Sequence, residues 1–91
     1  MIHRRLRLYG RVQGVCFREW SVSTARALGL RGWVRNREDG SVEILVAGEA
    51  AVVAGFVAAC REGPTAARVE RCEDEEAPAQ PLPVFTRRPT A

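Results

Sequence analysis

The chain has 91 residues and a formal net charge of +3. The sequence contains no lysine, so arginine supplies all of the positive side-chain charge that is counted at pH 7. Without lysine it can form neither a Walker-type phosphate loop nor a Schiff-base enzyme site. A chain of this length can bury one hydrophobic core, so we expect residues 1–91 to form a single domain.

The cysteines and the apolar runs indicate the compartment. Cys16, Cys60 and Cys72 are widely spaced and form no CxxC pair, which argues against a disulfide framework or a zinc site. We interpret them mostly as small buried hydrophobic residues in a reducing environment. No apolar run approaches the roughly 20 residues that cross a bilayer, and none follows the basic N-terminus as in a signal peptide. We therefore expect a cytoplasmic protein.

The N-terminal part predicts a strand followed by a helix. Leu6 and Leu8 alternate with polar residues, which predicts a half-buried strand over residues 3–10. From Phe17 onward, apolar or small residues recur at the spacing of one helical face. Gly29 follows this pattern and suits a left-handed cap at the end of the helix.

A hairpin comes next. Residues 31–36 and 42–47 are β-rich runs, and Asp39-Gly40 lies between them. An Asp-Gly pair between two such runs is a strong hairpin signal, because glycine can adopt the positive φ of a tight turn. The hairpin places Asn36 at the turn end of the second strand.

The remaining sequence predicts a helix, a strand and a terminal run. Residues 49–61 carry an apolar helical stripe that ends at Gly63-Pro64. Residues 67–72 form a weaker strand pattern, and the acidic residues 73–76 are interpreted as a solvated loop. Residues 84–87 could close an edge of the sheet as a short fifth strand.

This order, β-α-β-β-α-β, predicts an α+β fold. Right-handed crossovers place both helices on one face of an antiparallel sheet, which is the ferredoxin-like sandwich.

The stretch from Gly10 to Arg18, here called the cradle, joins the first strand to the first helix. Gly10 and Gly14 bracket a turn in which the backbone can approach a ligand closely. The first amides of the helix lack intrahelical partners, and the helix dipole favours an anion beside them. Arg18 adds a planar fork of donors. The cradle therefore predicts a site for a phosphate or a carboxylate.

Few other side chains could carry chemistry. His3 is the only histidine and has no partner for metal binding, and a nucleophilic thiol at Cys16 would lack a base. Asn36 alone indicates ordinary turn chemistry. Strict alternation places Asn36 with Val34 toward the core, whereas its position at the strand end permits a twist toward the cradle.

Two stretches closely resemble the signatures of the acylphosphatase family. They are GRVQGVCFR at residues 10–18 and GWVRNREDGSVE at residues 32–43, and the resemblance covers essentially the whole chain. It implies a ferredoxin-like acylphosphatase domain that hydrolyses the carboxyl-phosphate bond of small acyl phosphates without metal or cofactor. By motif position, the phosphate-binding arginine of the family falls on Arg18 and its water-orienting asparagine on Asn36. The cradle amides of the family fall on Gly14, Val15, Cys16, Phe17 and Arg18.

Three other interpretations compete with this one. The cradle could recognise a phosphate or carboxylate on a partner, or a basic sheet could bind RNA. The RNA interpretation needs exposed aromatic residues on central strands, and Trp33, its one candidate, is better explained as a core or sheet-face residue. The domain could also belong to a larger carbamoyl-phosphate-processing protein. We expect a stand-alone, monomeric enzyme that binds a small acyl phosphate and neither nucleic acid nor membrane.

Overall fold

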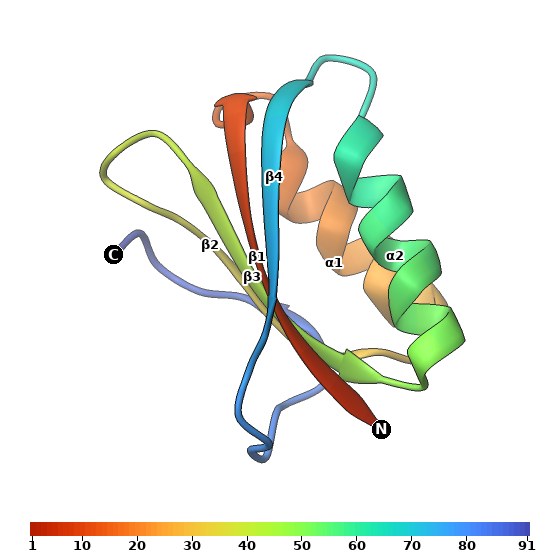
Figure 1. Ribbon diagram of the computed structural model, residues 1–91. Helices are drawn as coiled ribbons and strands as arrows, with labels where there is room; N and C mark the ends of the chain where they lie inside the picture. Colours follow the sequence, from red (N-terminus) through yellow and green to blue (C-terminus); the bar gives the residue numbers. More distant parts are fainter.

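The computed structural model describes all residues from Met1 to Ala91. Its elements are β1 (Ile2–Arg11), α1 (Phe17–Ala27), β2 (Arg31–Asn36), β3 (Val42–Gly48), α2 (Ala50–Glu62), β4 (Arg68–Glu76) and β5 (Thr86–Arg87). The strands form one sheet in the order β4-β1-β3-β2-β5, and both helices cover the same face of it (Figure 1). The predicted ferredoxin-like α+β fold is confirmed.

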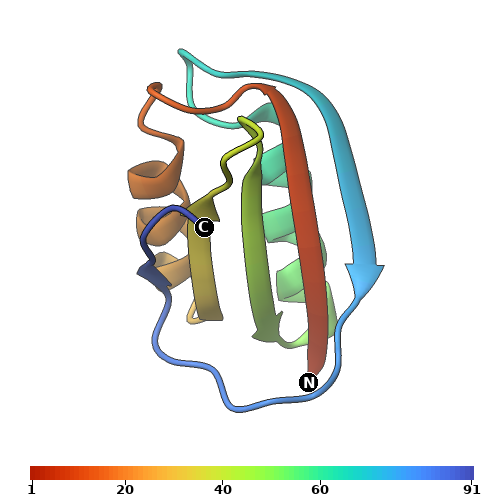
Figure 2. The same cartoon turned by 90° about the vertical axis from the view of Figure 1, so that its left-hand side faces the viewer.

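The short fifth strand makes the sheet mixed. The other four strands pair antiparallel, as expected, but β5 lies parallel to β2. After β4, residues 77–83 cross the lower end of the sheet to its opposite edge, so the chain enters β5 in the direction of β2 (Figure 2). Past β5, the chain continues along β2, because the Ala91 amide donates to the carbonyl oxygen of Asn36 at 3.1 Å.

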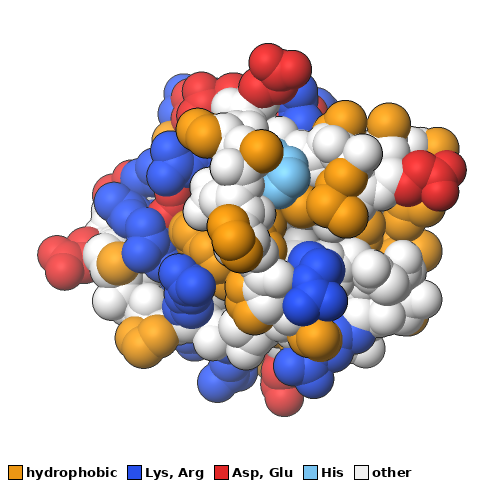
Figure 3. All heavy atoms as spheres, turned by 90° about the horizontal axis from the view of Figure 1, so that it is seen from below, with side chains coloured by type: hydrophobic (Ala, Val, Ile, Leu, Met, Phe, Trp, Pro, Cys, Tyr) orange, Lys and Arg blue, Asp and Glu red, His pale blue; other side chains and the backbone are white.

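The crossing segment covers the end of the sheet at which β1 begins. The only histidine, His3, is visible on this lower face (Figure 3). Its Nε2 is 3.1 Å from the carbonyl oxygen of Gln80. The single histidine is thus at the end of β1 opposite the cradle.

Neither helix has the length and apolar character needed to cross a membrane.

The acidic run at residues 73–76 is part of β4, so its interpretation as a solvated loop was wrong. The run pairs with the basic strand β1 along its whole length. Arg4 Nε lies 2.8 Å from the Asp74 carboxylate, which is one reason that these charges can sit in a strand. An edge strand also tolerates charged side chains, since much of it faces water.

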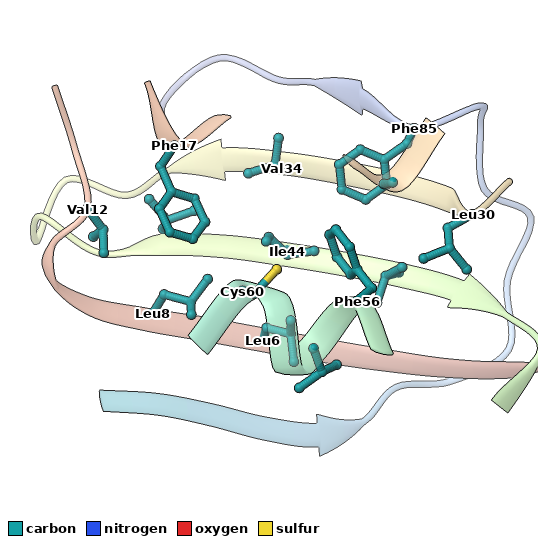
Figure 4. Close-up of a cluster of buried hydrophobic side chains, with 14 of the residues drawn as sticks. Leu6, Leu8, Val12, Phe17, Leu30, Val34, Ile44, Phe56, Cys60 and Phe85 are labelled. Atoms are coloured by element: carbon teal, nitrogen blue, oxygen red, sulfur yellow. The ribbon is translucent and has the colours of Figure 1, made fainter. Parts of the chain in front are cut away.

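The core lies between the sheet and the two helices (Figure 4). Phe56 of α2 meets Phe85 at an edge-to-face angle, with ring centres 5.7 Å apart. Cys60 is buried as expected, and burial raises the pKa of its thiol. Cys72 is half-buried, whereas Cys16 is exposed, so the expectation of a buried residue was wrong for Cys16. The reason is local, because Cys16 lies in the turn before α1 and not on its packed face.

Candidate active site

Three strands deliver side chains to the same end of the sheet. β1 and β2 are both antiparallel to β3, and β5 is parallel to β2, so these three strands run in one direction. The cradle, Asn36 and Arg87 therefore meet where the three strands end. They border one pocket of about 290 Å³. Its lining residues are Val12, Gln13, Gly14, Cys16, Phe17, Arg18, Glu19, Asn36 and Arg87.

The turn before α1 presents a row of unpaired amides. Gly14 has φ 72° and Cys16 has φ 62°, and Cys16 is the only non-glycine residue with a positive φ. The first helical bond runs from the Trp20 amide to the Cys16 carbonyl oxygen at 3.0 Å. The amides of residues 14–19 donate to no acceptor in the protein. Such a run at a helix N-terminus has the donors and the dipole that an anion needs.

Gly10 has a different function from the predicted one. It lies within β1, where the register against β4 shifts between Tyr9 and Gly10, and its φ is 117°. A Cβ atom at Gly10 would collide with the carbonyl oxygen of Arg68. Glycine here permits the close approach of β4, so Gly14 alone, and not a bracketing pair, belongs to the turn before α1.

Arg18 lies in the first turn of α1 and is half-buried at the pocket. It forms no ion pair with an acidic side chain. Its guanidinium group is therefore free to bind an anion, next to the unpaired amides.

Asn36 faces the same pocket from the end of β2. It shares its face of the strand with Val34, which is fully buried, but Asn36 itself is only half-buried and lines the pocket beside the start of α1. The two orientations that the sequence left open thus coincide, since the core side of the sheet opens into the pocket at this point. Its Oδ1 atom is buried and accepts no hydrogen bond. A buried acceptor without a partner is costly and calls for an explanation.

Four residues that line the pocket were not among the predicted site residues, namely Val12, Gln13, Glu19 and Arg87. Gln13 donates from Nε2 to the carbonyl oxygens of Arg37 and Ser41, both at 2.8 Å, and so ties the cradle to the β2–β3 hairpin. Its polar amide between apolar neighbours was the available signal. Arg87 reaches the pocket from β5, and nothing in the local sequence distinguishes it from its neighbour Arg88.

Trp33 is buried, as expected for a core or sheet-face residue. The guanidinium groups of Arg35 and Arg88 lie over its ring, at 4.7 and 5.0 Å from the ring centre. No group of three or more histidine, cysteine, aspartate or glutamate side chains is placed to hold a metal ion.

The fold and the pocket together define a ferredoxin-like α+β protein with a turn of unpaired amides at the start of α1. Residues 4–86 match the family model described as Acylphosphatase, and the chain belongs to that family.

Relatives of known name agree with this assignment. The acylphosphatase of Rhizorhabdus wittichii is 49% identical over 89 residues, which cover 98% of this chain and 90% of the relative. The crystal structure of the acylphosphatase from Bacillus subtilis superposes with a TM-score of 0.90 at 36% identity, over 94% of this chain and 97% of that one. The structure of T. kodakarensis HypF has a TM-score of 0.84 at 31% identity, and this chain covers 12% of its length. The same fold therefore also occurs within a much longer protein.

Proposed function

We propose that residues 1–91 form one acylphosphatase-like domain that hydrolyses the carboxyl-phosphate bond of small acyl phosphates to a carboxylate and inorganic phosphate. Membership of the acylphosphatase family and the names of the relatives support this reaction. The observation that carries it is the meeting of three features at one pocket. These are the unpaired amides of residues 14–19, the unpaired guanidinium of Arg18 and the unpartnered Oδ1 of Asn36.

The cradle holds the phosphoryl group. The amides of Gly14 to Arg18 donate to its oxygens, and the fork of Arg18 donates to two of them. Charge on these oxygens is redistributed as the bond to the acyl group breaks, and donors that are already oriented stabilise that change without reorganisation. Because an acyl phosphate already has a good leaving group, this stabilisation and the positioning of water are the main requirements.

Asn36 orients the water. Its Oδ1 accepts a hydrogen bond from the attacking water, which satisfies the buried acceptor and directs a lone pair of the water toward phosphorus. The water oxygen bonds to phosphorus, the bond between phosphorus and the acyl oxygen breaks, and the carboxylate leaves with that electron pair. An amide cannot take up the proton, so a phosphoryl oxygen of the substrate receives it.

This mechanism requires neither metal nor cofactor, since the amides and Arg18 bind the phosphoryl group. Activity should therefore survive exhaustive dialysis against a chelator. Loss of activity that added metal restores would contradict metal independence.

The decisive test is phosphate release from benzoyl phosphate by the purified protein. We expect hydrolysis well above the spontaneous rate, and loss of most of it in Arg18→Ala and Asn36→Ala. Arg68→Ala is the matched control, because Arg68 is exposed on β4 and lines none of the described pockets. A wild-type rate no greater than background would refute the proposal. Binding of inorganic phosphate without turnover would then favour an anion-binding module.

A further inference from the structure

The pocket continues past the cradle into a second hollow. Glu19 and Arg87 line both, and Val22, Ser23 and Arg26 complete the second one. The hollow extends along α1, away from the amides that face the phosphoryl group. It is therefore placed to receive the other half of a substrate, the acyl group.

Two arginines from different elements border this hollow. Arg87 lies opposite Val34 in the parallel pairing of β5 with β2, and paired residues of neighbouring strands project to the same face of a sheet. Arg87 thus shares the helix-covered face with Asn36. Arg26 is held beside β5, because its Nε donates to the carbonyl oxygen of Phe85 at 2.7 Å.

The positive charge here exceeds the negative charge. Arg87 forms no ion pair within the protein, and Glu19 pairs with neither arginine. When Arg18 and the amides hold the phosphoryl group, the charged side chains left in the hollow are those of Arg26, Arg87 and Glu19. They carry two positive charges and one negative charge. A neutral acyl group leaves one positive charge unmatched, whereas an acyl group that carries one carboxylate matches it.

We propose that Arg87 makes this site selective for acyl phosphates whose acyl group carries a carboxylate. This inference rests on the proposed function, since it assigns the substrate class of the same pocket. Arg87 is a specificity-determining residue, and Arg26 supports it from α1. The attraction acts at an exposed site, so it is modest and decreases as salt is added.

The test compares two substrates of equal size. The para carboxylate of 4-carboxybenzoyl phosphate cannot reach back to the acyl carbon, and 4-carbamoylbenzoyl phosphate replaces that charge with a neutral amide. We expect kcat/KM to be about three- to fivefold higher for the carboxylate, as for an exposed ion pair. The ratio should fall to about one in Arg87→Gln and stay at the wild-type value in Arg68→Gln. A wild-type ratio of one or less, or a ratio that Arg87→Gln leaves unchanged, overturns the inference.

Binding of inert analogues separates this inference from the proposed function. We expect 4-carboxybenzylphosphonate to bind more tightly than 4-carbamoylbenzylphosphonate in calorimetry, with the difference abolished by Arg87→Gln. If neither acyl phosphate is hydrolysed but this difference appears, the carboxylate site stands and the proposed hydrolysis fails. If benzoyl phosphate is hydrolysed but the analogues bind equally, the hydrolysis stands and the role of Arg87 is refuted.

Discussion

The Nε2 amide of Gln13 lies 2.8 Å from the carbonyl oxygen of Arg37, a residue 24 positions further along the chain. A second hydrogen bond from the same nitrogen reaches the carbonyl oxygen of Ser41. The cradle is thereby fixed to the hairpin that begins directly after Asn36. Together with the pairing of β1 and β2 to β3, Gln13 thus helps to fix the cradle relative to the proposed water site.

Removing this amide should impair turnover. In Gln13→Glu the shape is kept, but the donors are lost and a carboxylate faces two carbonyl oxygens. We expect kcat for benzoyl phosphate to fall about ten- to hundredfold, because even a small displacement of the reacting groups strongly lowers the rate of the chemical step. Inhibition by inorganic phosphate should change much less, since the amides and Arg18 remain. Gln80→Glu is the control, because Gln80 lies at the opposite end of the sheet. A kcat within twofold of wild type would exclude a positioning role for Gln13.

Arg18→Lys keeps the positive charge of the cradle but removes the planar fork. Lysine offers a compact ammonium charge without the rigid, planar pair of parallel donors that matches two phosphoryl oxygens. We expect kcat/KM for benzoyl phosphate to fall about a hundredfold, with weaker inhibition by inorganic phosphate. Near-normal kinetics in this variant would show that charge alone suffices.

Asn36→Ala should separate activity from stability. Loss of an oriented partner in the transition state is expected to lower kcat about a hundredfold or more, with a smaller effect on KM. The same substitution removes a buried, unpartnered oxygen, so the free energy of unfolding should stay the same or rise. Steady-state kinetics and urea unfolding of the same preparation measure both. A decrease in stability with normal kcat would assign Asn36 a structural role instead.

Local patterns predicted the parts of this site that depend on local geometry. Unpaired amides follow from any helix start, and the Asp39-Gly40 turn places Asn36 at the end of β2. The length of β4 and the position of Arg87 depend instead on pairing between distant segments. The charge of residues 73–76 is typical of a loop. A strand forms there because the run pairs with the arginines of β1, which are distant in the sequence. Arg87 enters the pocket only because β5 pairs with β2 in parallel.

The thiol of Cys16 is exposed, so its part in the reaction can be tested separately from that of its backbone amide. Its side chain is open to solvent at the pocket, but the proposed mechanism uses only its backbone amide. We therefore expect Cys16→Ala to keep kcat within about threefold. Cys16→Gly should also relieve the strain of φ 62°, which costs about 1 kcal/mol for a residue with a side chain. A hundredfold loss of kcat in Cys16→Ala would revive a nucleophilic thiol.

Glu43 links the stability of the hairpin to pH. Only 2% exposed, it lies 2.9 Å from Arg5, 2.8 Å from Arg35 and 3.2 Å from Arg37. Arg35 and Arg37 are the residues on either side of Asn36. Burial acts to raise the pKa of Glu43, but the hydrogen bond from Arg35 and the charges of the three arginines outweigh it and hold the pKa below its ordinary value.

A carboxylate whose pKa is lowered by folding stabilises the protein fully above its unfolded pKa, which is about 4.3 for glutamate. As the pH falls below that value, the unfolded chain takes up the proton first, so the free energy of unfolding should decrease between about pH 5 and pH 3.

Glu43→Gln should flatten this decrease and cost about 2 kcal/mol at pH 7, because three arginines lose their partner. Part of the slope should remain, since hydrogen bonds from Ser41 also lower the pKa of Asp39. Urea unfolding across this pH range, with exposed Glu75→Gln as the control, measures the difference. Equal slopes in the wild type and in Glu43→Gln would show that Glu43 does not couple folding to pH.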